Sequence, residues 1–394
     1  ETIMFTSQLT LSISRLVKSN LTNIRKMSAA INTDCVKSLL YKEYGDPDKV
    51  LQLITQTIEQ PIGEQVSVKW LLSPVNPADI NTIQGKYPSR PPLPAVPGNE
   101  GVGEIIAIGS DVQGLHVGDR VVPNGPNFGI WRTQANYDSK DVMKIPNDVD
   151  LVVASMLNVN PCTAYRMLKD FVPLKPGDTV IQNGGNSAVG QLVIQLCKIW
   201  NYKSVNVVRD RPNIQELKNQ LMSLGANEVL TEEEIRNTQL FKNKKLPAPK
   251  LALNCIGGQN ATEIVRHLVH GGIMVTYGGM SREPLTVPIS ALIFKDISFK
   301  GFWMTTWTKT NMNSQERLDM FKNLAGFFID KKLEPPPYKL VPFREYQEAI
   351  AKALSFDGRK GISKNPPQHV SGLTSLILMV ARMFPCSTYF SSYF

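Results

Sequence analysis

The stretch TVIQNGGNSAVGQLVIQLCKIWNYKSVNVVRDR, residues 179–211, decides the fold of this chain. Thr179–Gln182 is a short β-prone run, and Asn183–Gly185 predicts a turn that brings the backbone close to a ligand. Ala188–Trp200 has the apolar spacing of a helix, and Val205–Val208 predicts a second buried strand. Such a strand–turn–helix–strand unit places a pyrophosphate on a helix N-terminus, so the sequence predicts a nucleotide-binding domain.

The turn itself, from Gly184 to Gly190, departs from the strict glycine spacing of dinucleotide-binding turns. Its place between a strand and an amphipathic helix favours phosphate binding, because the first turn of a helix offers free N–H groups. Asn186 and Ser187 are placed either to cap this helix or to bond a phosphate oxygen. Plain helix capping is the alternative interpretation of the turn.

Two arginines after the second strand indicate which nucleotide is bound. An acidic residue at this point usually binds the ribose 2′-hydroxyl, and here Asp210 is flanked by Arg209 and Arg211. Guanidinium groups match the oxygens of a 2′-phosphate, so we expect NADPH rather than NADH. A solvated charged turn is the alternative for these three residues.

Strands and helices continue to alternate over residues 161–300, which predicts an α/β domain with a parallel, Rossmann-like sheet. Further elements are expected at Ile214–Leu224 and Ala261–Leu268 (helices) and at Glu228–Leu230, Lys250–Asn254 and Ile273–Tyr277 (strands). Gly278 and Gly279 follow the last strand and suggest close backbone approach to the dinucleotide. Phe302 and Trp303 either form a wall of the nicotinamide site or pack in the core.

Residues 36–160 have a different character, with many turns, few expected helices and several short strands. The strands are expected at Val36–Tyr41, Gln65–Leu72, Gly101–Ile108 and Arg120–Pro123, which indicates a compact barrel-like domain. Past residue 300, helices Ser314–Lys331 and Tyr346–Ser355 and a strand at Tyr338–Val341 are expected to pack back against this part. The nucleotide-binding domain is thus expected to be inserted into the β-rich one.

Composition limits the classes of function. With 394 residues, two domains are expected, and the net charge of +9 invites a nucleic-acid interpretation. Several basic residues lie in the N-terminal stretch and the others are scattered, so nucleic acid is not expected as a partner. A basic surface also suits an anionic substrate or an acidic carrier protein. Five separated cysteines and four histidines favour neither a disulfide framework nor a metal site.

Residues 1–27 have the composition of a mitochondrial transit peptide. They contain Arg15, Lys18, Arg25 and Lys26, are rich in Ser and Thr, and have no acidic residue after Glu1. A disordered N-terminal arm is the alternative. No run of residues approaches the roughly 20 apolar residues needed to span a bilayer, so no membrane span is expected. The expected location is the mitochondrial matrix.

Several motifs together resemble the medium-chain dehydrogenase/reductase superfamily, along nearly the whole chain up to about residue 364. NPADIN (76–81) and PGNEGVGEI (97–105) are signals of the whole superfamily. IQGKYP (83–88), NVNPCTAYRML (158–168) and VVRDR (207–211) are narrower and resemble the mitochondrial trans-2-enoyl-thioester reductases. The resemblance implies a GroES-like catalytic domain at 28–160 and 301–364, and a Rossmann domain at 161–300.

The zinc-dependent members of the superfamily carry a histidine where this chain has Asn99, and their catalytic cysteine has no counterpart near residues 76–81. The resemblance therefore implies a site without metal. It also implies that Tyr87 is the proton donor, assisting protonation at C2 after hydride from NADPH has added to C3 of an enoyl thioester. That substrate would be carried on acyl carrier protein or coenzyme A. A hydroxyl held near the thioester oxygen can stabilise the enolate charge.

The family's cofactor contacts carry over onto residues of both the nucleotide-binding part and the following segment. They are Asn160, Asn186, Ser187, Ala188, Val189, Arg209, Asp210, Arg211, Tyr277, Gly278, Gly279, Met280, Phe302, Trp303, Met304 and Lys364. Ala188 is a departure, since relatives often have glycine there. The tail, residues 365–394, does not match the family, and its two prolines do not suit the expected final strand.

Two further functions remain open from the sequence. An NADPH:quinone reductase shares the fold and the zinc-free site but does not need Tyr87 as a proton donor. The atypical tail also suits a non-enzymatic splice-variant product with impaired folding. The superfamily commonly dimerises through the sheet edge of the cofactor domain, so a homodimer is expected.

Overall fold

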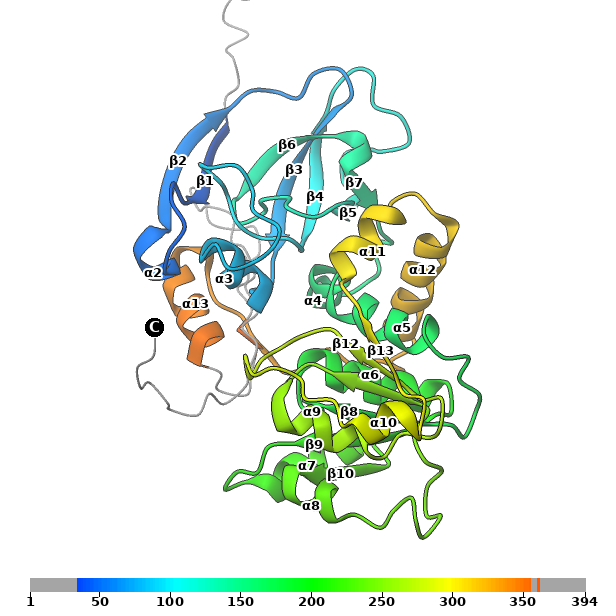
Figure 1. The fold of residues 1–394 in the computed structure, drawn as a ribbon. Helices are drawn as coiled ribbons and strands as arrows, with labels where there is room; N and C mark the ends of the chain where they lie inside the picture. Colours follow the sequence, from blue (N-terminus) through cyan, green and yellow to red (C-terminus); the bar gives the residue numbers. More distant parts are fainter. Residues whose placement is uncertain (1–33, 356–359, 362–394) are drawn as a thin grey trace, which may run out of the picture.

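The computed structural model describes residues 34–355 and 360–361 of the chain. These residues form two parts, one built on an antiparallel sheet and one on a parallel sheet with helices on its faces (Figure 1). The predicted α/β class, with a Rossmann-like domain beside a β-rich domain, is confirmed. Among the described residues, no helix has the length and apolar character to cross a bilayer.

The β-rich part contains a five-stranded antiparallel sheet and a separate hairpin. The sheet has the order β6-β3-β4-β5-β7, and β1 pairs with β2 in the hairpin. The strands are β1 (Asp34–Leu40), β2 (Gln52–Ile58), β3 (Gln65–Leu72), β4 (Val102–Ile108), β5 (Arg120–Pro123), β6 (Gln134–Asp138) and β7 (Val142–Lys144). The helices are α2 (Pro47–Val50), α3 (Pro77–Ile83) and α4 (Leu151–Met156), with a 3₁₀ turn at Ser139–Asp141.

The second part is a six-stranded parallel sheet of order β10-β9-β8-β11-β12-β13. Its strands are β8 (Thr179–Asn183), β9 (Lys203–Val208), β10 (Glu228–Thr231), β11 (Leu251–Asn254), β12 (Ile273–Thr276) and β13 (Ser298–Gly301). The helices are α5 (Asn160–Lys169), α6 (Ala188–Ile199), α7 (Ile214–Ser223), α8 (Glu232–Asn237), α9 (Gly258–Val265) and α10 (Ile289–Ile293). Because all strands run the same way, their carboxyl ends meet at one edge, where ligands of such sheets bind.

After β13 the chain returns to the first part. The returning elements are α11 (Met304–Thr310), α12 (Gln315–Ile329), β14 (Tyr338–Lys339), a 3₁₀ turn at Phe343–Glu345, α13 (Tyr346–Ser355) and β15 (Lys360–Gly361). In Figure 1, α13 lies beside α2 of the β-rich part. Phe343 and Ile350 are buried in one apolar cluster with Val68 and Trp70 of β3.

A shared apolar core joins the two parts. Leu72 and Val102 of the antiparallel sheet belong to the same buried cluster as Leu192 of α6 and Leu253 of β11. The seam between the two sheets is therefore packed, and it holds the residues on either side in a fixed relation.

Most predicted elements coincide with the observed ones, including β3, β5 and α13 residue for residue. The expectation of few helices before residue 160 overlooked α3 and α4, and the hairpin strand β2 was not predicted. In α3 the apolar positions are few, and Pro77 at the first helical position marks its start better than any period does. The predicted transit peptide, Lys364 and the tail from 365 to 394 lie outside the described residues.

Candidate active site

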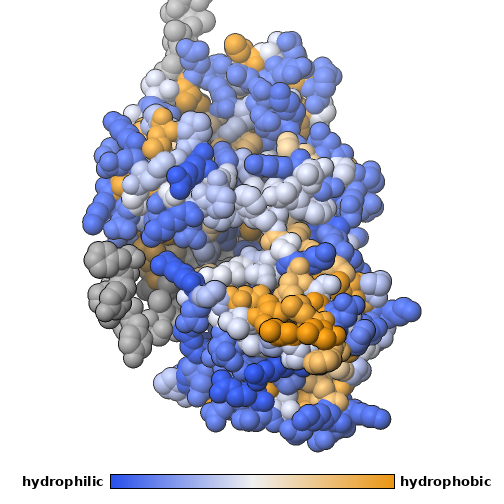
Figure 2. Space-filling view, in the orientation of Figure 1, coloured by the Kyte–Doolittle hydropathy of each residue, from blue (hydrophilic) through white to orange (hydrophobic). Residues whose placement is uncertain are grey.

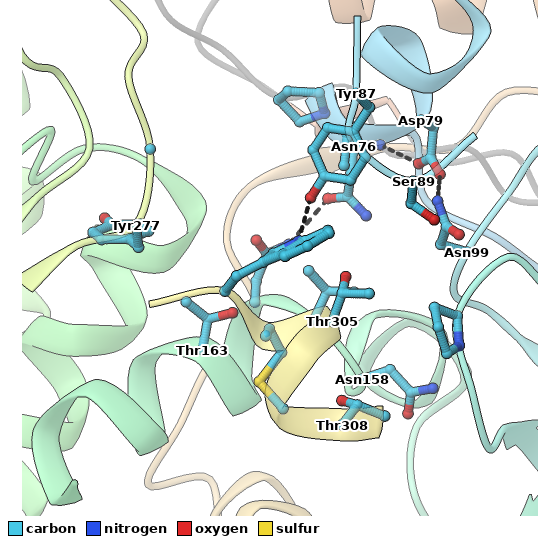
Figure 3. A pocket seen from close by; sticks show the side chains of 18 of the residues that line it. Asn76, Asp79, Tyr87, Ser89, Asn99, Asn158, Thr163, Tyr277, Thr305 and Thr308 are labelled. Atoms are coloured by element: carbon cyan, nitrogen blue, oxygen red, sulfur yellow. Dashed lines mark hydrogen bonds between the residues drawn. The ribbon is translucent and has the colours of Figure 1, made fainter. Parts of the chain in front are cut away.

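A cavity of about 330 Å³ opens between the two parts of the molecule. The β-rich part contributes Asn76, Asp79 and Tyr87 to its lining, and the parallel-sheet part contributes Val189 and Tyr277. Figure 3 shows Tyr277 on one side of this cavity, Tyr87 near its centre, and Asn158 and Thr308 on the side away from Tyr277. The cavity therefore connects the carboxyl edge of the parallel sheet with the loop of Tyr87, the predicted proton donor.

Tyr87 lies on the loop after α3, where its backbone N–H donates to the Asn81 carbonyl at 3.1 Å. Its hydroxyl accepts a hydrogen bond of 2.7 Å from Trp303 Nε1, and the two rings meet edge to face with centroids 5.7 Å apart (Figure 3). Burial raises the pKa of the Tyr87 phenol, which hydrogen bonds with Trp303 and Thr305 partly oppose. The phenol is thus a neutral hydroxyl at physiological pH.

Behind Tyr87 lies a buried network of amide and carboxylate side chains. Asp79 accepts from the Asn76 backbone N–H at 2.8 Å and from Asn99 Nδ2 at 2.7 Å. Glu100 is fully buried and accepts from Asn76 Nδ2 at 2.6 Å and from the Val159 N–H at 2.9 Å. These bonds tie the loop before α3 to the start of α5, because Asn160 Nδ2 also donates to Asn76 Oδ1 at 3.3 Å.

Apart from Asn160, which was predicted as a cofactor contact, this network had no role assigned from the sequence, although all of its residues lie in or beside the motifs that carry the resemblance. The spacing Asn76-Pro77-Ala78-Asp79 at the start of α3 is a helix-start signal that would have found one part of it. Asn99, which replaces the histidine of zinc-dependent members, bonds to Asp79 and accepts from the Asn127 N–H at 2.9 Å. Within the described ranges, no three His, Cys, Asp or Glu residues are grouped as metal ligands would be.

The turn after β8 is shaped by close backbone contacts. A methyl group at Gly190 would lie 2.5 Å from the Gly184 carbonyl oxygen, so α6 starts directly against the turn. Ser187 caps α6 by accepting from the Gly190 N–H at 2.9 Å, which makes its side chain a helix cap. Asn186 lies half-buried in the same turn, and Ala188 and Val189 are buried at the start of α6.

Gln182 supports this turn from inside the sheet and was not predicted. It is fully buried, and its Nε2 donates to the Gly190 carbonyl at 2.9 Å and to Asn206 Oδ1 at 2.7 Å. One side chain therefore connects the turn to β9, whose end carries the two arginines. A polar residue inside a β-prone run was the available signal, since a buried amide needs partners.

Arg209, Asp210 and Arg211 follow β9 directly, at the expected end of the strand. The Asp210 side chain accepts from the Arg211 N–H at 2.8 Å. Partial burial and the neighbouring Arg209 charge both lower the pKa of Arg211. The Gly185 N–H of the turn before α6 donates to the Val207 carbonyl near the end of β9. Two guanidinium groups of like charge after that strand form a place where a dianion would be stabilised.

The cavity brings together more than half of the residues predicted to contact the cofactor. Its lining includes Asn160, Val189, Tyr277, Gly278, Gly279, Met280, Phe302, Trp303 and Met304. Asn186, Ser187, Ala188 and the three residues after β9 lie in the turn and at the strand end, outside that lining. Lys364 lies outside the described residues. Thr163 and Thr305 also line the cavity and were not singled out from the sequence.

The fold and the site together define an oxidoreductase of the medium-chain dehydrogenase/reductase class. Family models match as an alcohol dehydrogenase GroES-like domain over residues 63–147 and as a zinc-binding dehydrogenase over residues 188–323. The mitochondrial enoyl-[acyl-carrier-protein] reductase of Rattus norvegicus is 48% identical over 321 residues, covering 81% of this chain and 86% of the relative. The chain belongs to the family of mitochondrial enoyl-[acyl-carrier-protein] reductases.

Solved structures agree with this assignment. An Etr1p complex with NADP and crotonyl-CoA matches with a TM-score of 0.76 and 36% identity, covering 82% of this chain and 98% of that one. The Etr1p/Etr2p heterodimer from Candida tropicalis matches with the same TM-score and 37% identity, over the same shares of the two chains. An NADPH:quinone reductase from Bacillus thuringiensis is 23% identical with a TM-score of 0.71, which shows the shared fold alone.

Proposed function

We propose that this protein uses NADPH to reduce trans-2-enoyl thioesters, on acyl carrier protein or coenzyme A, to saturated acyl thioesters in mitochondrial fatty acid synthesis. The family supports this activity, since its curated members are named for the acyl carrier protein and for the mitochondrion. The observation that carries it is a single cavity lined both by Tyr87 and by residues at the carboxyl edge of the parallel sheet. In this cavity Trp303 donates a hydrogen bond to the Tyr87 hydroxyl. The mitochondrial matrix is the proposed location.

The residues at the edge of the parallel sheet fit a phosphorylated dinucleotide. The tight turn before α6 packs directly against the first residues of that helix. The helix is long enough for its N-terminal end to carry a partial positive charge, which favours a phosphate there. Arg209 and Arg211 would hold the 2′-phosphate of NADPH. The rest of the dinucleotide would contact Asn160, Tyr277 to Met280 and Phe302 to Met304. Gly279 has no atom within 4 Å of the position of a Cβ, so a ligand can approach its backbone.

Bound NADPH supplies the hydride that adds to C3 of the enoyl thioester. Tyr87 is proposed to donate its hydroxyl proton toward the thioester oxygen or C2, where negative charge develops. Its raised pKa keeps the proton on the phenol until the substrate charge appears. A neutral donor also releases the uncharged product without forming an ion pair.

The buried network behind Tyr87 is proposed to fix the loop that carries this residue. Asp79, Asn99 and Glu100 each take part in two or more hydrogen bonds, so the start of α3 is held from several directions. A hydroxyl that is positioned before the reaction needs no reorganisation when charge develops.

A homodimer is proposed, formed through the cofactor domain. β13 is an edge strand of the parallel sheet, and α10 just before it exposes apolar side chains. Ile293 is 67% exposed and Phe294 is 75% exposed, and Figure 2 shows an apolar patch in this region of the surface. An edge strand beside an apolar patch suits pairing with a second copy about a twofold axis. The Etr1p/Etr2p structure is a heterodimer of related chains.

The activity is tested by assaying the purified protein with NADPH and either crotonyl-CoA or a quinone. Oxidation of NADPH that depends on crotonyl-CoA and yields butyryl-CoA is the expected result. Turnover of the quinone without reduction of crotonyl-CoA would overturn the proposal in favour of a quinone reductase. Absence of both activities, with no thermal stabilisation by NADPH, would support a non-enzymatic protein.

A further inference from the structure

Two asparagines end neighbouring strands of the parallel sheet, and both are fully buried. Asn183 is the last residue of β8, and Asn254 is the last residue of β11. Asn183 Nδ2 donates to Asn254 Oδ1 at 2.8 Å. Asn254 Nδ2 in turn donates at 3.1 Å to Oγ1 of Thr276, the last residue of β12. A chain of side-chain hydrogen bonds therefore joins the carboxyl ends of three adjacent strands.

The loop after β11 fixes the orientation of both amides. The Cys255 N–H donates to Asn183 Oδ1 at 2.8 Å. The N–H groups of Ile256 and Gly257 donate to Asn254 Oδ1 at 3.2 Å and 3.1 Å. A backbone N–H can only donate, so both side-chain oxygens are acceptors and each Nδ2 points to the next side chain along the sheet. The two asparagines thus hold this loop through three backbone hydrogen bonds.

The same loop supports one wall of the active-site cavity. The Cys255 carbonyl accepts from the Met280 N–H at 3.0 Å, and the Asn254 carbonyl accepts from the Tyr277 N–H at 2.9 Å. A methyl group at Gly278 would lie 3.2 Å from the Cys255 carbonyl oxygen, so the two loops are in close contact. Tyr277, Gly278 and Met280 line the cavity. The nicotinamide end of NADPH is expected at this wall, because its hydride has to reach a substrate held at the proposed proton donor.

The residue before Asn183 makes a separate connection, toward the other half of the cofactor site. Gln182 donates to the Gly190 carbonyl in the turn and to Asn206 Oδ1 in β9, the strand that ends at the two arginines. Successive side chains of a strand point to opposite faces of the sheet. Gln182 therefore supports the part of the site proposed for the phosphates, while Asn183 supports the part proposed for the nicotinamide.

We propose that Asn183 and Asn254 are positioning residues for hydride transfer, acting through the loop after β11 on the wall that holds the nicotinamide. This inference rests on the proposed NADPH-dependent reduction. Both side chains are 0% exposed, so they act through this loop and not by contact with the cofactor. Hydride transfer depends steeply on the distance and angle between donor and acceptor carbons, whereas binding is spread over the whole dinucleotide. A shift of this wall is therefore expected to slow the chemical step more than it weakens binding.

The test measures NADPH binding by fluorescence titration and hydride transfer by single-turnover reduction of crotonyl-CoA at saturating NADPH. Asn183→Leu is expected to slow hydride transfer about tenfold or more, while the NADPH dissociation constant rises less than about threefold. Gln182→Leu, a matched change at the adjacent residue, is expected to weaken NADPH binding more than it slows hydride transfer. A primary isotope effect with NADPH deuterated at C4 of the nicotinamide shows that the measured rate is that of hydride transfer.

Thr276 tests the same chain of hydrogen bonds with a smaller change. Thr276→Val removes the acceptor of Asn254 Nδ2 with little change of shape and is expected to slow hydride transfer about threefold. Thr276→Ser keeps the hydroxyl and is expected to retain the wild-type rate. Thermal unfolding shows whether each variant is folded, and the pair at Thr276 decides the question if Asn183→Leu does not fold.

The outcomes separate this inference from the function on which it rests. Equal losses of binding and of hydride transfer in both Asn183→Leu and Gln182→Leu would overturn the positioning role and leave the reductase function standing. A wild-type rate in Thr276→Val, or an equally slow Thr276→Ser, would overturn the part assigned to Asn254. A wild-type protein that does not reduce crotonyl-CoA would overturn the proposed function, and this inference with it.

Discussion

Trp303 Nε1 donates a 2.7 Å hydrogen bond to the hydroxyl of Tyr87, a residue 216 positions earlier in the chain. An indole N–H can donate but not accept, so the Tyr87 oxygen is the acceptor and its own proton is free to point elsewhere. The bond crosses from the segment that follows the parallel sheet to the loop after α3. It therefore orients the proposed proton donor and joins the two sides of the cavity through one contact.

Replacing Tyr87 with Phe is expected to lower kcat for crotonyl-CoA about a hundredfold or more, because the general acid is lost. The affinity for NADPH is expected to stay within about twofold, since the hydroxyl lies at the cavity centre and not at the nucleotide turn. Stopped-flow reduction and fluorescence titration with NADPH measure the two quantities. Turnover equal to that of the wild type would rule out Tyr87 as the donor.

The pH dependence of kcat follows from the raised pKa of Tyr87. The active form is the protonated phenol, so activity is lost as pH rises through the pKa, which lies above the ordinary value of about 10. No descending limb caused by Tyr87 is therefore expected between about pH 7 and 9. Trp303→Phe removes a bond that lowers this pKa and is expected to move the alkaline limb to higher pH. A wild-type limb near neutrality that vanishes in Tyr87→Phe would contradict this assignment.

Cofactor preference is expected to depend on the arginines after β9. Arg209→Ala and Arg211→Ala should each weaken NADPH binding about tenfold to a hundredfold, because each loses a charge-assisted hydrogen bond to the phosphate. NADH lacks that phosphate, so its binding should change little. The measurement is the ratio of the dissociation constants for NADPH and NADH. Lys218→Ala, on the outer helix α7 and paired with Glu234, is a matched loss of charge that should leave the ratio unchanged.

The glycine turn offers a steric test. In Gly190→Ala, the new methyl group would lie 2.5 Å from the Gly184 carbonyl oxygen, so the turn must shift and NADPH binding should fall by at least tenfold. Gly326→Ala in α12 is the control, because no atom lies within 4 Å of its Cβ position. That helical substitution should stabilise the fold by about 0.5–1 kcal/mol in thermal or denaturant unfolding. Equal NADPH affinity in Gly190→Ala and the wild type would show that the turn does not bind the cofactor.

The proposed dimer is tested at α10. Phe294→Asp places a charge on the apolar patch and should convert the dimer to a monomer, measured by sedimentation velocity. Ile62→Asp, at a residue that is 73% exposed in the β-rich part, is a control of similar exposure and should leave the assembly unchanged. A wild-type protein that sediments as a monomer at all concentrations would refute the dimer.

The sequence was most informative where the structure depends on neighbours in the chain. The unit from Thr179 to Arg211 follows from local periodicity, and the structure reproduces its strand, turn, helix and strand within two residues at each boundary. Tyr87 was assigned through resemblance, because a tyrosine on a Gly/Pro loop has no distinguishing local pattern. Its bond to Trp303, and the bond from Asn76 to Glu100, depend on tertiary packing that no local spacing encodes.

Ser187 shows a question that the sequence left open. The sequence offered two partners for its hydroxyl, a helix N–H or a phosphate, and both are compatible with a residue before a helix. The structure gives the Gly190 N–H as the observed partner, and Ser187 is 1% exposed.

The packing of α13 against the β-rich part has a consequence for how the chain assembles. Phe343 and Ile350 complete an apolar core whose other members, such as Val68 and Trp70, come from much earlier in the chain. A chain that emerges N-terminus first from the ribosome or an import channel can form the contiguous parallel sheet before α13 has appeared. The earlier β-rich segment cannot complete its core until that last helix is available. During that interval the incomplete β-rich part exposes apolar surface, so this enzyme's dependence on chaperones is expected to centre on the domain that carries Tyr87.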